Sequence, residues 1–201
     1  MGEAVVVTIR RLGPDLLDDY LAFFDDRAFT DNPSWDACYC WFPHHDPAAG
    51  EWTARTGAQN REAVTAAITN GTMSGYLAYA DGQVVGWCSA APRDRYPTLA
   101  ELPGDGASVG FTPCFIVDPA WRGRGVGRRL LQAAVEGLAA DGMERLQGAP
   151  IRDAATPAER HRGTIEVFKV HGYERVADLP DGTSLMEQSL SSRRPRRGGC
   201  A

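Results

Sequence analysis

The sequence predicts an α/β (α+β) fold in which helices flank one central sheet, within a single domain of residues 1–190. Two runs with a period of two are joined by Asp81-Gly82, which is typical of a hairpin over residues 75–90. Residues 124–140 repeat apolar side chains at helical spacing. A glycine-rich turn joins this helix to a strand at residues 109–117, so strands and helices belong to the same core.

The first third contains two helices and a segment of a different kind. Residues 5–11 alternate apolar and polar side chains and predict a strand, and an apolar stripe from residue 16 to residue 24 predicts a helix. A second helix is predicted at residues 59–69, ended by Asn70-Gly71. Residues 28–57 have no sustained period, and their many aromatic side chains favour an ordered loop or short helices.

The remaining elements follow the hairpin. Residues 92–107 are rich in Pro, Gly and Asp and predict a loop, and Pro113 predicts an irregularity in the strand that comes next. After the long helix we expect a strand at 145–150, a helix at 163–170, and strands at 173–176 and 184–189. The predicted order is therefore β-α-α-β-β-β-α-β-α-β-β.

Composition and charge limit the function. The 201 residues are 43% hydrophobic and 23% charged, as in an ordinary globular domain. The net charge of −5 argues against a nucleic-acid partner, which would need a basic face. No apolar run reaches the roughly 18 residues of a membrane span, so no membrane partner is expected. Five irregularly spaced cysteines and no basic leader favour reduced thiols and a cytoplasmic location. The arginine-rich residues 191–201 are expected to be disordered.

The turn at residues 117–128 (V-D-P-A-W-R-G-R-G-V-G-R) carries the strongest functional signal. The start of a helix presents unpaired backbone N–H groups, and its dipole favours an anion there. Glycines let a phosphate approach the backbone closely, and arginines add positive charge. The pattern supplies both, with Gly123, Gly125 and Gly127 interleaved with Arg122, Arg124 and Arg128. We therefore expect a phosphate-bearing ligand rather than a purely structural turn.

Two common nucleotide-binding motifs do not fit this turn. A P-loop needs G-x-x-x-x-G-K-[ST], but the only lysine of the chain is Lys169. A dinucleotide fingerprint would stand near the start of a βαβ unit, whereas this turn lies past mid-chain after an antiparallel meander.

The sequence of the turn and its flanking residues resembles a motif of a known protein family. Residues 115–131 (F-I-V-D-P-A-W-R-G-R-G-V-G-R-R-L-L) resemble the cofactor motif of the GNAT superfamily of acyl-CoA N-acetyltransferases, [Q/R]-x-x-G-x-[G/A], whose core matches residues 122–127. Residues 165–173 (I-E-V-F-K-V-H-G-Y) are similar to the family's later helix-to-strand segment. The order of elements also agrees, so the resemblance covers roughly residues 5–190.

This resemblance implies a mixed, mostly antiparallel sheet that splays open after the motif strand and holds acetyl-CoA in the gap. Backbone groups of Phe115 and Val117 would pair with the pantetheine arm, and N–H groups of residues 123–128 would hold the pyrophosphate. A backbone N–H of the splayed strand would polarise the thioester carbonyl. The implied cofactor-binding residues are Phe115, Ile116, Val117, Arg122, Gly123, Arg124, Gly125, Val126, Gly127 and Arg128.

The catalytic residues are less well indicated. Many members of the family use a tyrosine to protonate the leaving thiolate, but this chain has Phe168 at that position, and Tyr173 fits a core role. Each acid or small polar candidate also has an ordinary explanation, as a solvated surface group or as packing within a strand. The candidates for the catalytic role are Glu166, Asp153 and Ser89, with His161 and Cys114 as further residues expected near the cleft.

The acceptor is left open by the sequence. Residues 31–40 (D-N-P-S-W-D-A-C-Y-C), together with residues 54–62, 75–79 and 84–88, are similar to a subset of the family that includes kasugamycin-type aminoglycoside N-acetyltransferases. That likeness implies a polycationic sugar amine held by the acidic first sixty residues, which carry ten Asp/Glu and four Arg. The implied substrate-binding residues are Trp35, Asp36, Cys38, Tyr39 and Trp41.

Other possibilities stay open beside the aminoglycoside. The acceptor could be another small amine or a protein amine, and a CoA-binding domain without turnover is the alternative outside catalysis. Residues 38–45 (C-Y-C-W-F-P-H-H) contain zinc-ligand types but not the usual zinc spacings, so a lid, an acceptor pocket or aromatic packing is favoured over a metal. GNAT proteins are often dimers, and a homodimer is compatible with this sequence.

Overall fold

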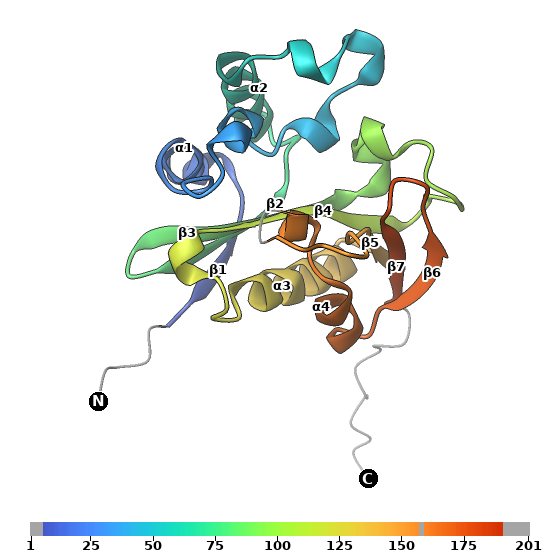
Figure 1. Cartoon of the computed structure of the whole chain (residues 1–201). Coiled ribbons are helices and arrows are strands. Elements are labelled where there is room, and N and C mark those ends of the chain that lie inside the picture. Colours follow the sequence, from blue (N-terminus) through green and yellow to red (C-terminus); the bar gives the residue numbers. More distant parts are fainter. Residues whose placement is uncertain (1–5, 157–158, 191–201) are drawn as a thin grey trace.

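The computed structural model describes residues 6–156 and 159–190, and its strands form one seven-stranded sheet in the order β1-β2-β3-β4-β5-β7-β6 (Figure 1). The strands are β1 (Thr8–Arg11), β2 (Gly75–Ala80), β3 (Gln83–Pro92), β4 (Val109–Val117), β5 (Arg145–Gly148), β6 (Glu174–Asp178) and β7 (Ser184–Ser189). The α-helices are α1 (Leu17–Asp26), α2 (Gly57–Thr69), α3 (Val126–Ala140) and α4 (Ile165–Val170). The predicted fold class and element order are confirmed. The arginine-rich tail predicted to be disordered lies outside the described residues.

The sheet is mixed, because one of its strand pairs is parallel. All neighbouring strands pair antiparallel except β4 and β5. Those two strands pair only from Val109 with Arg145 to Phe111 with Gln147. No strand of the described chain pairs with this edge of β4 beyond Phe111, so the sheet opens there, as the resemblance implied.

A β-bulge lies in β4 at the point where the sheet opens. Ser89 of β3 is opposite Cys114, but Ala91 is opposite Phe111, so β4 has an extra residue between these two pairs. Pro113 stands in this interval, and it has no N–H with which to continue the ladder. The irregularity predicted from Pro113 is confirmed.

Helices cover both faces of the sheet. Figure 1 shows α1 and α2 on one face and α3 and α4 on the other. The alternating residues of the central strands supply both cores, and the fully buried Trp87 faces α1, where its ring lies edge-on to Tyr20 at 5.0 Å. Gly75 makes room for that indole, because a Cβ there would lie 2.3 Å from its ring.

The aperiodic segment of the first third folds as four single-turn or short 3₁₀ helices. These are η2 (Pro33–Cys38), η3 (Phe42–His44), η4 (Pro47–Ala49) and η5 (Trp52–Ala54), so the prediction of short helices here is confirmed. Two side chains from α1 and α2 donate hydrogen bonds to backbone carbonyl groups of this segment and fix its position. The hydroxyl of Tyr20 donates to the carbonyl of Tyr39 at 2.6 Å, and the amide of buried Asn60 donates to that of Ala37 at 2.8 Å.

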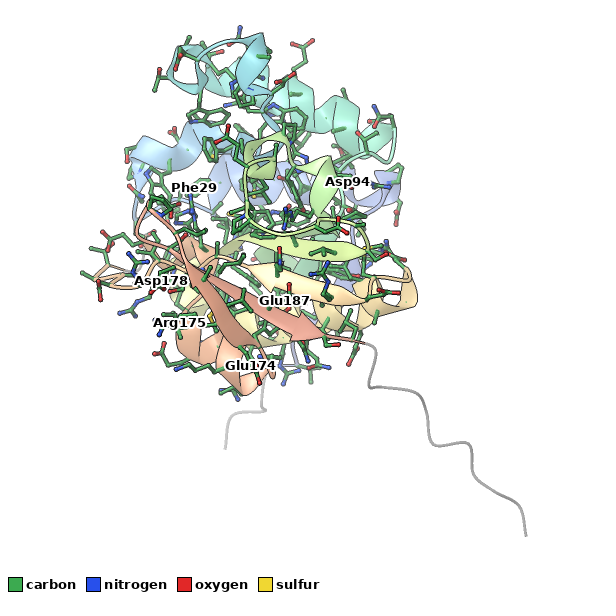
Figure 2. The ribbon with its side chains drawn as sticks, turned by 90° about the vertical axis from the view of Figure 1, so that its right-hand side faces the viewer. Phe29, Asp94, Glu174, Arg175, Asp178 and Glu187 are labelled. Atoms are coloured by element: carbon green, nitrogen blue, oxygen red, sulfur yellow. The ribbon has the colours of Figure 1, made fainter. Side chains whose placement is uncertain are left out.

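The outer edge of the sheet carries charged side chains. Figure 2 shows Glu174, Arg175 and Asp178 along β6, with Glu187 on the neighbouring β7. Arg175 and Asp178 form an ion pair at 3.5 Å. Charges on an edge strand disfavour pairing with a strand of another chain.

The strand predicted after the long helix and the helix that follows it are both shorter in the structure. The strand predicted at 145–150 ends at Gly148, where β4 and β5 have already separated. The helix predicted from residue 163 begins at Ile165, because Gly163 has a left-handed φ of 83° and Thr164 acts as the N-cap.

Candidate functional site

The start of α3 presents unpaired donors. The carboxylate of Asp118 accepts from the backbone N–H of Ala120 at 2.9 Å and fixes the turn that precedes the helix. Gly125, with a left-handed φ of 79°, is the N-cap and has no side chain to cap it. In the described chain no acceptor faces the backbone N–H groups from Gly123 to Arg128. A helix start of this kind binds anions through its N–H groups and its dipole.

The open edge of β4 faces the same space. The N–H of Asp118 donates to the carbonyl of Val85 on β3 at 3.0 Å, so backbone groups of alternate residues point toward β3. Those of Phe115 and Val117 point to the opposite, open edge. A cavity of ≈ 390 Å³ lies there, and it is lined by Phe115, Ile116, Val117, Arg122, Gly123, Gly125, Val126, Gly127 and Arg128 among others.

The arginines near the turn have different roles. Arg122 forms a bidentate ion pair with Asp31, with 3.1 Å between Nη2 and Oδ1, and its Nε donates to the carbonyl of Val117 at 3.1 Å. Hydrogen bonding from Arg122 lowers the pKa of Asp31 below its usual range. Arg122 therefore ties the first third of the chain to the turn. The guanidinium of Arg124 lies over the ring of Trp121 at 4.9 Å, and Arg124 is not part of the cavity wall.

Two other arginines face the cavity with their charge uncompensated. Arg128 and Arg160 line it, and neither forms an ion pair with any described residue. The sequence singled out Arg128 but missed Arg160, because only the loop after β5 brings Arg160 to the turn. Free guanidinium groups beside unpaired N–H groups suit a ligand with several phosphates.

A larger cavity of ≈ 630 Å³ adjoins the first. It lies between the short helices of the first third and β4, and Phe42, Trp52, Phe111 and Cys114 contribute to its wall. Both cavities are lined by Phe29, Trp35, Ile116 and His161, so these side chains form a shared wall. Within it the rings of Trp35 and His161 meet edge to face at 4.8 Å. A ligand in one cavity can thus reach a ligand in the other beside the imidazole.

The three residues predicted as catalytic do not line either cavity. Ser89 is fully buried in β3, and its hydroxyl is 3.0 Å from that of Tyr96. Asp153 and Glu166 are exposed to solvent. Glu166 lies in the first turn of α4. The sequence indicated polar residues in the right segments, but only the loop after β5 turns one of them, His161, toward the shared wall.

Only some of the residues predicted to bind substrate line a cavity in the structure. Trp35 and Cys38 line the larger cavity, whereas Asp36, Tyr39 and Trp41 do not. Tyr39 instead donates its hydroxyl to Asp25 at 2.6 Å, and Trp41 stacks on His44 with 5.2 Å between ring centres. Short helices turn successive side chains in different directions, so neighbours in sequence separate in space.

The position of the family's usual acid lies in the core. Phe168 is fully buried and packs edge-on against Phe115 and Tyr173 at 6.2 and 5.0 Å. A Cβ added at Gly148 would lie 2.4 Å from the tip of its ring, so the ring points at β5. No tyrosine of the described residues lines either cavity. A leaving group in this site has no phenol to protonate it.

The thiols of the larger cavity are not arranged as a metal site. Cys38, Cys40 and Cys114 line the cavity, and burial raises the pKa of Cys38 to about 11, so its thiol is protonated at neutral pH. His45 is directed away from them, with its Nε2 2.8 Å from the carbonyl of Gly50. Residues 6–156 and 159–190 contain no group of three or more His, Cys, Asp or Glu placed to hold a metal.

His44 should make the protein sensitive to acid. Its ring lies between Trp41 and Tyr96, its Nε2 has no hydrogen-bond partner among the described residues, and burial lowers its pKa to about 4. The unfolded state, with an ordinary histidine pKa of about 6.5, takes up the proton first as pH falls. Stability from this group is therefore complete above pH ~6.5 and is lost toward pH ~4, by up to about 3 kcal/mol.

The His44→Phe variant keeps a ring in this place but cannot be protonated. Urea unfolding between pH 7.5 and 4.5 should show the variant losing about 2–3 kcal/mol less of its free energy of unfolding than the wild type. His171→Phe, which replaces a partly exposed histidine outside this aromatic cluster, provides the matched control. Parallel curves for all three proteins would contradict the role of His44.

The fold and the cavities together define a class of protein. The sheet opens between two parallel strands, and the gap adjoins a helix start with free N–H groups, which is an arrangement suited to an anionic ligand. The family model described as "Acetyltransferase (GNAT) family" matches residues 14–173. The chain therefore belongs to the GNAT acetyltransferase family.

Solved structures show the same fold at low sequence identity. An N-acetyltransferase from Staphylococcus aureus is 17% identical, with a TM-score of 0.57 over 92% of this chain and 99% of its own. The PaiA N-acetyltransferase from Thermoplasma acidophilum, solved with coenzyme A, is 13% identical, with the same score and the same coverage. The aminoglycoside acetyltransferase AAC(6')-Ib, also with coenzyme A, is 19% identical, with a TM-score of 0.56 over 92% and 96%.

Two further searches gave negative results. The search of curated proteins found no match. Within residues 6–156 and 159–190, no helix is both long enough and apolar enough to cross a membrane.

Proposed function

We propose that this protein transfers the acetyl group of acetyl-CoA to the primary amine of a small molecule by direct attack. The shared wall of the two cavities is the observation that carries the proposal. It lets a thioester from the smaller cavity and an amine from the larger one meet beside His161 and Ile116. Holding both reactants at one point removes most of the entropic cost of the bimolecular step.

The smaller cavity fits the cosubstrate. The N–H groups from Gly123 to Arg128 would donate hydrogen bonds to the pyrophosphate, and Arg128 and Arg160 would neutralise phosphate charge. The backbone of Phe115 and Val117 at the open edge of β4 would pair with the amide groups of the pantetheine arm. Such strand-like pairing would lead the thioester toward the shared wall.

His161 is the group in the right place to take the proton of the amine. Imidazole is the side chain that ordinarily exchanges protons between pH 5 and 8. As the amine nitrogen bonds to the thioester carbon and the carbon–sulfur bond breaks, the surplus proton passes from nitrogen to His161. The thiolate then takes a proton from water or from the imidazolium, because Phe168 cannot supply one.

A small acceptor suits the larger cavity better than a protein. Its ≈ 630 Å³ are of the size usual for a drug-sized ligand, and side chains of η2, η3 and η5 form much of its wall. The sequence likeness to kasugamycin-type enzymes keeps aminoglycosides among the acceptors to be tested. Transfer to a protein amine, and cofactor binding without turnover, are the alternatives that the same experiment separates.

The test measures release of the CoA thiol from acetyl-CoA in the presence of a panel of amines. The panel contains aminoglycosides including kasugamycin, polyamines, aralkylamines, amino acids and a lysine-rich protein. We expect turnover with a small amine and heat of binding for acetyl-CoA in calorimetry. Binding without turnover on any amine would leave only a CoA-binding domain, and absence of binding at sub-millimolar concentration would end the proposal. Unchanged kasugamycin susceptibility of an expressing bacterium would exclude that acceptor.

A further inference from the structure

The charge of the larger cavity differs from what the acidic first third of the sequence led us to expect. None of the ten acids among the first sixty residues lines it. The one carboxylate of the described residues in its wall is Asp181, which already pairs with Arg162 at 3.2 Å. Both Asp181 oxygens are engaged, because Thr183 donates to the other one through its N–H and its hydroxyl.

Arg55 supplies a positive charge without a counterion. It lines the cavity, is partly buried, and forms no ion pair with any described residue. Its Nε donates to the side-chain oxygen of Asn60 at 2.6 Å, and its Nη2 donates to the carbonyl of Gln59 at 3.2 Å.

The orientation of Arg55 is itself fixed by a buried amide. Asn60 is 1% exposed and donates to the carbonyl of Ala37 at 2.8 Å, so its oxygen points at Arg55. The guanidinium therefore keeps unused N–H donors in a fixed place, which is the arrangement that binds a carboxylate in two-point contact.

The rest of the wall is mostly apolar. Aromatic and aliphatic side chains dominate it, among them Phe29, Trp35, Phe42, Trp52, Leu99 and Phe111. A ligand with several ammonium groups would lose much hydration here and find no free carboxylate in return. A ligand with an apolar body and one acidic group would bury its apolar surface and pair with Arg55.

We propose that the acceptor is a primary amine with an apolar or aromatic body and one acidic group, which Arg55 binds. This inference rests on the proposed function, since it names the substrate class of the same site. The amine lies at the His161 end of the cavity and the carboxylate at the Arg55 end. Polycationic aminoglycosides and polyamines are poor acceptors, contrary to the sequence likeness.

The test compares matched acceptors by CoA thiol release. One series contains phenylalanine and dipeptides that end in phenylalanine, which vary the distance between the amine and the carboxylate. Each of these acids is compared with the same compound carrying a C-terminal amide in place of the carboxylate. Spermidine and kanamycin represent polycations. The wild type should prefer at least one acid over its amide by about 10-fold in kcat/KM, as expected for one charge-assisted contact.

Variants assign that preference to Arg55. Arg55→Gln should remove the roughly 10-fold advantage of the acid, so that acid and amide turn over at similar rates, whereas Arg55→Lys should keep part of that advantage. Arg61→Gln is the control, because Arg61 lies on the same helical layer, pairs with Asp25 at 2.9 Å and does not line the cavity. Unaltered acetyl-CoA affinity shows that the variants are folded.

Three results would overturn the inference. Faster turnover of a polycation than of any acid would do so, and so would equal losses for acid and amide in Arg55→Gln. Either leaves the acetyltransferase proposal standing. Failure of every amine, including the lysine-rich protein, would instead remove the proposed function and this inference together.

Discussion

Replacement of His161 by alanine is expected to lower kcat on the identified amine by about 100-fold, the usual contribution of a positioned general base. His161 lies on the wall shared by the two cavities, in edge contact with Trp35. In the proposed mechanism its imidazole takes the proton of the attacking amine, and alanine cannot do so. Steady-state kinetics at several pH values would measure the loss. Imidazole added to the buffer should restore part of the rate, because it can enter the space that the side chain leaves.

Two further variants separate catalysis from packing. His161→Phe keeps a ring against Trp35 but accepts no proton, so it should lose rate to a similar degree while binding acetyl-CoA normally. His171→Ala, on a residue that lines neither cavity, should have wild-type kinetics. If imidazole restores nothing and His161→Phe retains full activity, His161 acts only through packing and another group takes the proton.

Introduction of a side chain at Gly127 should weaken acetyl-CoA binding by a factor of about 10 to 100, or about 1.4–2.7 kcal/mol. Gly127 lies in the first turn of α3 and lines the cavity below the turn. A Cβ there meets nothing within 4 Å, so the protein itself has room for the new side chain. The valine of Gly127→Val would occupy the space next to the free N–H groups, where the pyrophosphate must approach the backbone closely.

Calorimetric titration of acetyl-CoA would measure this loss, and thermal unfolding would check the fold. Gly127 has an ordinary helical backbone, unlike Gly125, so the valine should not strain the chain. Ala140→Val puts the same side chain at the exposed end of the same helix, outside both cavities, and should bind like the wild type. Normal affinity in Gly127→Val would mean that the phosphates bind elsewhere.

The sequence was sufficient for most of the fold. The D-G hairpin, the helical apolar repeat of α3 and the proline in β4 are local patterns, and each fixes the structure of its own segment. The same holds for the turn at residues 123–128, because unpaired N–H groups at a helix start and the freedom of glycine follow from a few consecutive residues.

The acceptor side could not be predicted in this way. His161, Arg55 and Arg160 come from loops and short helices whose side-chain directions have no period to interpret. The acidic composition of the first sixty residues suggested a pocket for cations. In the structure Asp25 and Asp31 pair with Arg61 and Arg122, and neither lines the larger cavity.

The sequence by itself thus determined the family, the order of elements and the glycine-rich turn with its unpaired N–H groups, since all of these follow from local patterns along the chain. The tertiary structure alone decided which polar side chains meet. In the folded protein Ser89 is buried in the core and Glu166 is exposed to solvent. His161 contacts Trp35, although more than a hundred residues separate them in the sequence. The physical reason is that the acceptor cavity lies between the short helices and the sheet, so its lining depends on long-range packing. A charged side chain can bind a ligand strongly only where no other side chain of the fold already neutralises it.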